Sequence, residues 1–320
     1  MTAGEAGPVS EVRPLAAALR DGERVLRDAG VGSARTDVEL LAAHLLGTTR
    51  GDVLAAAVLG RPAPEGLDAL VARRAARVPL QHLTGSAPFR GLELEVGPGV
   101  FVPRPETEQV AQVAIDAAAE VAASRGSALV VDLCTGSAAV ALAVAHEVPR
   151  ATVHAVELDV RAHAWAARNV AALVPDGRVH LVRGDARTAL RDLDGTCDVV
   201  VANPPYIPPD AVPVDPEVRD HDPGVALYGL GPDGLEVPRG VVAAAARLLR
   251  PGGVLVMEHA EVQAAAVRAL VHDGGLFTEV RTLPDLGGRD RMVAARRAGG
   301  GVGRAAPARG TPGDVEDSLP

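Results

Sequence analysis

Apolar residues recur every three or four positions through the first part of the chain, from about residue 10 to residue 78. Leu15 and Leu19 begin one such pattern, and Leu67 begins another. This spacing is typical of amphipathic helices that bury one face. The pattern therefore predicts a small helical bundle, which we assign as an N-terminal domain over residues 1–80.

Polar residues in this helical region lead to two further predictions. Thr36 and Glu39 stand three residues apart and indicate a capping box at the start of a helix. Arg73, Arg74 and Arg77 accompany the last helical pattern. Because runs of charge on helices usually face water, we interpret these arginines as a solvated face, and a patch that docks a partner is the alternative.

The spacing of apolar residues changes to two after the bundle. Leu92 and Leu94 alternate with glutamates, and residues 97–99 (Gly-Pro-Gly) precede the apolar residues 100–102. Alternation followed by a turn signal predicts a β-hairpin. We place this hairpin in a linker over residues 81–103.

From residue 104 onward, helical and strand patterns alternate. Such alternation predicts an α/β fold, in which a mostly parallel sheet carries helices on both faces. Ligands then bind at the carboxyl ends of the strands. The predicted helices are 107–123, 138–146, 161–172, 237–249 and 261–273, and the predicted strands are 128–133, 152–157, 178–182, 197–202, 253–258, 277–283 and 291–296. This domain spans 104–297, and the Gly- and Pro-rich tail over 298–320 is predicted to be disordered.

Composition narrows the function. The 320 residues are 48% hydrophobic but only 2% aromatic, and the net charge of −9 disfavours a protein that neutralises many phosphates. A protein or small-molecule substrate fits better, with no direct binding of nucleic acid or membrane. Neither a long apolar run nor a signal peptide is present, so we expect a cytoplasmic protein. Cys134 and Cys197 fall at opposite ends of parallel strands, about 15 Å apart, and should be free thiols.

Three predicted strands end in features that suit an adenosyl group. The first runs into a turn of small residues, where a ligand could approach the backbone and the following helix offers N–H donors. The second ends in Glu157, about twenty residues later, where a carboxylate can accept from ribose hydroxyls. The third ends in Asp185, next to Ala186, where a carboxylate could accept from the adenine amine. Each feature alone could be an ordinary turn or helix cap. The turn residues are Asp132, Cys134, Thr135, Gly136, Ser137 and Ala138.

The cofactor predicted from this edge is S-adenosylmethionine. No lysine-bearing phosphate loop is present, and no basic residue replaces Glu157, which disfavours ATP and NADP. No cluster of His and Cys has the spacing of metal ligands, so we expect no metal.

The fourth predicted strand delivers Asn203-Pro204-Pro205-Tyr206 to the same edge. The prolines end the strand and hold Asn203 in extended geometry. A planar amide or amine nitrogen is a poor nucleophile, and Asn203 Oδ1 with the Pro204 carbonyl could accept both of its N–H groups and stabilise developing positive charge. Tyr206 would stack on the flat target. The motif serves glutamine and adenine equally well.

With these motifs the chain resembles the release factor glutamine methyltransferase (HemK/PrmC) family over roughly residues 10–297. The resemblance rests on Pro79–Gly85, Phe89 to Leu92, Val102–Glu108, the turn after Asp132, Asn203–Ile207 and Pro251–Gly253. It implies a Rossmann-like class I methyltransferase sheet. It also implies transfer of a methyl group to the side-chain amide of the glutamine in the Gly-Gly-Gln motif of peptide chain release factors, during translation termination.

The same resemblance implies roles for particular residues. The turn Thr135–Ser137 and Glu157 would hold the cofactor, Asn203–Tyr206 would hold the substrate amide, and the helical domain would dock the release factor. Arg104 and Glu106 would close over the cofactor or the entering loop, or form a structural ion pair between domains. We expect a monomer.

Some features depart from the family pattern, and rival functions remain. Cys134 and Ala138 stand where the family usually has glycine, and Glu157 where aspartate is commoner. The alternatives are a ribosomal-protein glutamine methyltransferase and an adenine-methylating DNA or RNA enzyme. A non-catalytic binding module is a third, which intact Asn203 disfavours.

Overall fold

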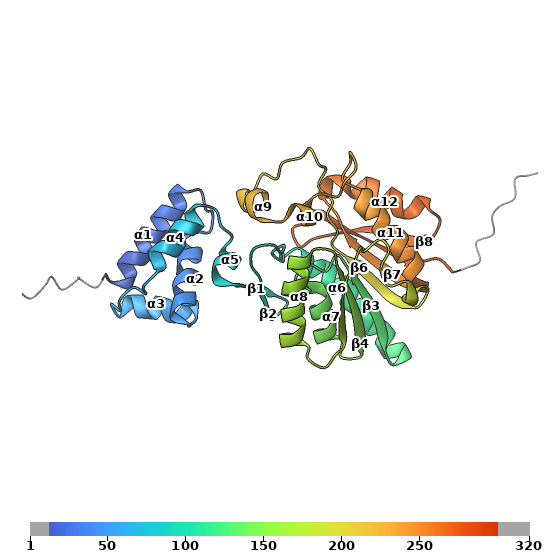
Figure 1. Cartoon of the computed structure of the whole chain (residues 1–320), viewed down its shortest axis with the longest axis horizontal. Helices are drawn as coiled ribbons and strands as arrows, with labels where there is room; N and C mark the ends of the chain where they lie inside the picture. Colours follow the sequence, from blue (N-terminus) through green and yellow to red (C-terminus); the bar gives the residue numbers. More distant parts are fainter. Residues whose placement is uncertain (1–12, 300–320) are drawn as a thin grey trace, which may run out of the picture.

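The computed structural model describes residues 13–299. A group of helices lies at one end and a sheet covered by helices at the other, with α5 and a two-stranded hairpin between them (Figure 1). This arrangement confirms the predicted α/β fold class with an N-terminal helical part. No helix among residues 13–299 is long and apolar enough to cross a membrane.

The N-terminal part is a bundle with its own apolar core. Leu15, Leu19 and Leu26 are buried there together with Val38 and Leu41 of the next helix. The apolar residues that recur at helical spacing therefore form the buried faces of these helices. Its helices are α1 (Leu15–Asp28), α2 (Ala34–Leu46), α3 (Arg50–Val58), α4 (Leu67–Ala75) and α5 (Leu80–Thr84).

The predicted capping box at Thr36 is wrong. Helix α2 already begins at Ala34, so Thr36 lies in its first turn. Glu39 is buried and forms ion pairs instead, including one with Arg50 at 2.6 Å. A capping box does occur one helix later, where the Thr49 side chain caps α3.

The hairpin exists but is displaced from its predicted position. It pairs β1 (Ser86–Phe89) with β2 (Leu92–Glu95) around a two-residue turn. Both turn residues, Arg90 and Gly91, have positive φ angles, as a tight hairpin turn requires. Residues 97–102 form no strand. The alternation at 92–95 was read correctly, but its partner strand precedes it.

The main sheet has seven strands in the order β5-β4-β3-β6-β7-β9-β8. The first five are parallel, while β9 is antiparallel to both neighbours. The strand order reverses between β3 and β6, which is where ligands bind in such sheets. The strands are β3 (Ala128–Leu133), β4 (Ala151–Glu157), β5 (Val179–Arg183), β6 (Cys197–Ala202), β7 (Leu249–Glu258), β8 (Phe277–Pro284) and β9 (Asp290–Arg297).

Alternate residues of the strands face two separate cores. Val130 packs with one set of helices, and Val131, its neighbour in the chain, packs with the other. The first set is α6 (Thr107–Arg125), α7 (Ala139–Glu147) and α8 (Val160–Leu173). The second set is α11 (Glu236–Leu248) and α12 (Ala264–Asp273), and two short 3-10 turns, η1 (Arg191–Leu193) and η2 (Glu261–Gln263), complete the domain.

A long connection between β6 and α11 carries two helices for which no prediction was made, α9 (Pro216–His221) and α10 (Gly224–Leu227). Glu217 of α9 accepts hydrogen bonds from Arg74 at 2.7 Å and from Arg77 at 2.8 Å. Arg74 is buried and Arg77 half-buried. The prediction that these two arginines form a solvated face is therefore wrong, because they join the helical bundle to α9. Arg73 is exposed as expected.

Two smaller predictions are also settled in part. Cys134 and Cys197 are free thiols, as expected. Ala298 is buried and donates a backbone hydrogen bond to Leu276, so the predicted disordered tail does not begin there. The remainder of that predicted tail, 300–320, lies outside the described residues.

Candidate active site

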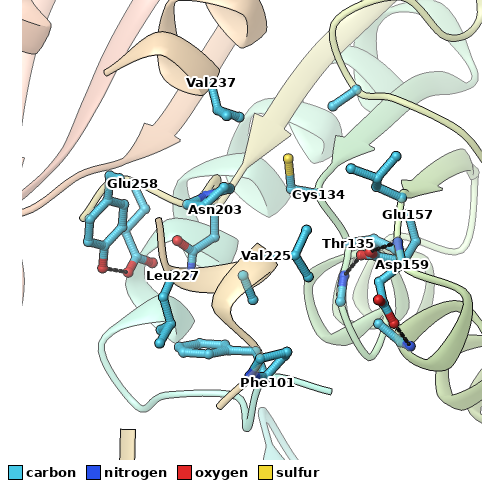
Figure 2. Close-up of a pocket in the computed structure, with 18 of the residues that line it drawn as sticks. Phe101, Cys134, Thr135, Glu157, Asp159, Asn203, Val225, Leu227, Val237 and Glu258 are labelled. Carbon is cyan, nitrogen blue, oxygen red and sulfur yellow. Dashed lines mark hydrogen bonds between the residues drawn. The ribbon is translucent and has the colours of Figure 1, made fainter. Parts of the chain in front are cut away.

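A cavity of about 720 Å³ opens at the carboxyl edge of the sheet, beside the point where the strand order reverses. Its wall combines the turn after β3, the end of β4, the residues after β6 and the segment around α10. In Figure 2, Asn203 and Glu258 lie at one end, and Thr135 and Glu157 at the other. The volume is within the range of small-molecule and cofactor sites.

The turn after β3 is tied to the neighbouring strand. The backbone N–H of Thr135 donates to the Val156 carbonyl at 2.9 Å, and that of Gly136 donates to Glu157 Oε2 at 2.8 Å. Gly136 has a φ of 60°, and a Cβ built on it would meet no atom within 4 Å. The backbone is therefore open to close approach by a ligand at this position, as the small-residue turn predicted, although the N–H groups of Thr135, Gly136 and Ala138 already have partners.

Glu157 is buried at the end of β4. Its carboxylate accepts backbone N–H bonds from Gly136 and from Asp159, both at 2.8 Å. Burial raises the pKa of Glu157, and these hydrogen bonds act against that shift. Because each carboxylate oxygen can accept more than one bond, Glu157 keeps capacity for the hydroxyls of a ribose.

The other two acids of the predicted cofactor site are held by the protein itself. Asp132 is buried, accepts from Thr135 Oγ1 at 2.5 Å and from the Ala141 N–H at 3.1 Å, and burial raises its pKa to about 7. Asp185 forms an ion pair with Arg187 at 2.7 Å, which lowers the pKa of Asp185. Asp132 thus holds the turn in place through hydrogen bonds, whereas Asp185 lies in the cavity wall with its carboxylate paired to Arg187.

The cavity suits a cationic ligand. Seven acidic side chains and two basic ones stand in its wall, which leaves an excess of negative charge. An open glycine backbone, a ribose-compatible carboxylate and negative charge together fit S-adenosylmethionine, whose sulfonium is positive. The acidic residues are Glu106, Asp132, Glu157, Asp159, Asp185, Asp215 and Glu258, and the basic ones are Arg104 and Arg187.

Asn203 follows β6 and is fixed by a hydrogen bond. Its Nδ2 donates to Thr107 Oγ1 at 3.3 Å, and that hydroxyl donates to Glu258 Oε2 at 2.8 Å. An amide that uses its nitrogen in this way has its Oδ1 free to accept. The arrangement supports the predicted role of Asn203 as an acceptor for a substrate N–H.

Tyr206 lies at the same end of the cavity. Its hydroxyl donates to Glu258 Oε1 at 3.4 Å, and burial raises its pKa. Gln263 Nε2 donates to the Tyr206 carbonyl at 2.8 Å, which fixes the backbone of the motif from behind. The ring is therefore held as a neutral wall of the cavity.

Most of the predicted site residues line this one cavity, with two exceptions. Ala138 is fully buried, and its N–H donates to the Thr135 carbonyl, so it shapes the turn without facing the ligand space. Pro204 is buried and is not part of the cavity wall, whereas Pro205 is. The predicted residues in the wall are Arg104, Glu106, Asp132, Cys134, Thr135, Gly136, Ser137, Glu157, Asp185, Ala186, Asn203, Pro205 and Tyr206.

Arg104 connects the start of the catalytic domain to the segment over the cavity. It forms an ion pair at 2.5 Å with Asp222, whose side chain is fully buried, and its guanidinium stacks on Phe101. Both Arg104 and Phe101 line the cavity. The ion pair between Arg104 and Asp222 joins two segments around the cavity and does not link the helical bundle to the sheet.

Glu258 and Thr107, which hold Asn203 and Tyr206 in place, are among the cavity residues that were not predicted from the sequence. Glu258 ends β7 at the same sheet edge as Glu157, so the strand-end rule that found Glu157 could have found it too. Thr107 stands inside a family string that was recognised, but nothing in the sequence places it beside Asn203, 96 residues away.

Comparison with known proteins places the chain in a family. The PrmC N-terminal domain matches residues 17–85, and the methyltransferase small domain matches residues 103–214. A release factor glutamine methyltransferase from Streptomyces coelicolor is 50% identical over 290 residues, covering 89% of this chain and 98% of its own length. One from Mycolicibacterium smegmatis is 48% identical over 289 residues, covering 88% and 98%.

A relative with a different substrate is also similar. The 4-amino-L-phenylalanine/4-methylamino-L-phenylalanine methyltransferase of Streptomyces pristinaespiralis is 41% identical over 274 residues, which cover 84% of this chain and 91% of that protein. Both kinds of relative carry the name methyltransferase. From the two matched domains and the near full-length identity, the chain is an S-adenosylmethionine-dependent methyltransferase that belongs to the release factor glutamine methyltransferase family.

Proposed function

We propose that this enzyme methylates the side-chain amide nitrogen of the glutamine in the Gly-Gly-Gln motif of a peptide chain release factor. The observation that carries the proposal is the orientation of Asn203. Its nitrogen is used by Thr107, so its oxygen is left to accept an N–H of a planar substrate at the end of the cavity. Relatives at 50% and 48% identity bear the name of this activity.

Each residue of the motif has a distinct task in this reaction. Asn203 Oδ1 accepts one N–H group of the amide, and the carbonyl of Pro204, although the residue itself is buried outside the cavity wall, would accept the other. The two bonds turn the nitrogen lone pair away from the acceptors and stabilise positive charge as it develops. Tyr206 covers the flat face of the amide. S-adenosylmethionine supplies the electrophilic methyl group, and Glu157 with the turn at Gly136 orients it. The proton on nitrogen can leave after transfer, so no base is required beforehand.

The division of the chain follows from the same proposal. Residues 1–80 dock the release factor, 81–103 link the domains, and 104–297 carry the reaction. Arg74 and Arg77 support this division, since they hold α9 in the wall of the cavity against the bundle. We further propose a cytoplasmic monomer, because release factors act on cytoplasmic ribosomes and both thiols are free.

A free aromatic amine is the second candidate substrate. The similar enzyme from Streptomyces pristinaespiralis is named for such an amine, whose N–H groups the same acceptors could bind. A ribosomal-protein glutamine would also fit Asn203. Nucleic acid is less favoured, because the acidic wall of the cavity would repel phosphates.

The test is methyl transfer to separate acceptors. The enzyme is incubated with labelled methyl donor and, in turn, a release factor, a ribosomal protein, 4-amino-L-phenylalanine and duplex DNA. We expect label on one glutamine of the release factor. In Asn203→Ala, the rate should fall at least about a hundredfold, since one preorganised acceptor is lost, while cofactor affinity measured by calorimetry stays the same. Label on the amine or on DNA alone would overturn the assignment.

A further inference from the structure

We propose that Thr107 and Glu258 are positioning residues that fix which end of the Asn203 amide faces the substrate. This inference rests on the proposed function, because it takes Asn203 Oδ1 as the acceptor for the reacting nitrogen. The residues come from three separate elements: the start of α6, the end of β7 and the corner after β6. Thr107 is 5% exposed and Glu258 2% exposed, so water competes little for their hydrogen bonds.

The order of donors along this chain of hydrogen bonds follows from the proton count. An ionised carboxylate only accepts, so the hydroxyl of Thr107 must donate its one proton to Glu258, at 2.8 Å. The oxygen of Thr107 then has only lone pairs to offer Asn203, at 3.3 Å. The amide must therefore present its NH2 group to Thr107 and its oxygen to the cavity.

The opposite orientation of Asn203 would oppose the reaction. It would place NH2 against the N–H groups of the substrate and bring a positive dipole end towards a nitrogen that becomes positive during transfer. Glu258 also accepts from Tyr206 at 3.4 Å. One buried carboxylate thereby connects the amide that binds the substrate nitrogen with the ring that covers it.

The groups around Glu258 affect its charge in opposite directions. Burial raises the pKa of Glu258 to about 7, and Glu106 of the cavity wall adds to that effect. Hydrogen bonds from Thr107 and Tyr206, together with the positive charge of Arg291 on β9, act in the opposite direction. His259, next in the chain, is buried with a lowered pKa and so remains neutral near pH 7.

The first test compares three threonine variants. Thr107→Val removes the hydroxyl at nearly constant shape, and Thr107→Ser restores it. Thr282→Val is the matched control, since within residues 13–299 the buried Thr282 hydroxyl has no hydrogen-bond partner. We expect kcat to fall at least about tenfold in Thr107→Val, with cofactor affinity unchanged, and to recover most of the way in Thr107→Ser. Thr282→Val should match the wild type.

The second test uses pH and serves even if Thr107→Val folds poorly. As pH falls through about 7, Glu258 takes up a proton and no longer forces Thr107 to donate to it. The kcat of the wild type should therefore fall on the acid side. Glu258→Gln cannot ionise, so its kcat profile, measured at saturating cofactor, should lack this acid limb.

Both tests use whichever acceptor the wild type methylates in the preceding assay. A wrong substrate assignment would show there, whereas a wrong assignment of the network shows only in the variants. Wild-type kcat in Thr107→Val, equal losses in Thr107→Ser and Thr107→Val, or an unchanged acid limb in Glu258→Gln would each overturn the inference.

Discussion

Two residues other than glycine hold the left-handed backbone in the turn that follows β3. Cys134 has a φ of 64° and Ala138 a φ of 69°, on either side of Gly136 at 60°. A non-glycine residue costs about 1–2 kcal/mol in this conformation. Hydrogen bonds from the backbone to Asp132 and Glu157 hold the turn in spite of that cost. Cys134 and Ala138 therefore lower the stability of the turn, whereas the position that faces the ligand, Gly136, remains glycine.

Substituting Gly136 by alanine separates strain from ligand binding. A Cβ here meets no atom within 4 Å, so the free protein loses only the cost of a left-handed alanine, about 1–2 kcal/mol. The same methyl group would stand in the cavity wall, where a cofactor must approach the backbone. We expect the affinity for S-adenosylmethionine, measured by calorimetry, to fall at least about tenfold.

Gly126→Ala is the matched control. Gly126 ends α6 outside the cavity wall, has a φ of 90°, and likewise offers open space to a Cβ. This variant should lose a similar free energy of unfolding but keep the affinity for the cofactor. Equal affinity in the wild type and Gly136→Ala would show that the turn does not contact the cofactor.

At the scale of residues, the sequence predicts those site residues that end a strand or directly follow one. Glu157 and Asn203 follow strands that parallel pairing brings to one edge, so both could be placed without a structure. Thr107 could not, because its partners depend on how α6 packs across the sheet. Arg74 was misread for the same reason, since its partner Glu217 lies 143 residues away.

At the scale of elements, the short helix α9 joins the bundle to the active site. Glu217 on α9 pairs with Arg74 and Arg77, and Arg74 also pairs with Asp37 of α2 at 2.7 Å. Asp215 and Val218, from the same segment, line the cavity. Helix α9 therefore contacts the bundle on one side and contributes to the cavity wall on the other.

Glu217→Gln tests this connection. The change leaves two arginines with one fewer anion, one of them buried, and should lower the free energy of unfolding by about 3 kcal/mol. Burial opposes ionisation of Glu217, but hydrogen bonds from Arg77 and Arg74 outweigh it and lower its pKa to about 2. A lowered carboxyl pKa stabilises above the unfolded value of about 4.3. The difference from the wild type should thus be full at neutral pH and vanish towards pH 2, as measured by denaturant unfolding.

Asp220→Asn on the same helix is the control. Asp220 pairs with its neighbour Arg219, and both side chains are exposed. Exposed pairs contribute little to stability, so we expect no measurable change in unfolding. A loss as large as that of Glu217→Gln would mean that α9 itself, and not its link to the bundle, is sensitive to substitution.

The elements that the sequence predicts well are those with a strong periodic pattern of apolar residues. Helix α6 and strand β3 were placed within two residues, since each has a strong pattern of its own. The hairpin was displaced because Gly97-Pro98-Gly99 is a stronger turn signal than Arg90-Gly91. Arginine rarely adopts a positive φ, so the local sequence does not indicate a turn at Arg90-Gly91. The helices α9 and α10 are short and held by tertiary contacts, which local patterns do not contain.

At the scale of the whole molecule, part of the excess of acidic over basic residues lies in the wall of the ligand cavity. The cavity wall holds more acids than bases, and burial raises the pKa of three of the acids, Asp132, Glu157 and Glu258. Asp132 and Glu258, whose pKa values are raised to about 7, are partly protonated near neutral pH in the free protein. They are therefore able to change protonation when a charged ligand enters.

This coupling predicts a pH-dependent affinity for the cofactor. A sulfonium cation favours the ionised form of nearby carboxyls, so S-adenosylmethionine should release protons on binding and bind about tenfold tighter at about pH 8 than at about pH 6. Calorimetry in two buffers of different ionisation enthalpy measures the protons released. S-adenosylhomocysteine, which lacks the sulfonium charge, is the matched ligand and should show a smaller pH slope. Because the two ligands share the adenosine contacts, identical slopes would mean that Asp132 and Glu258 do not sense the charge in the cavity.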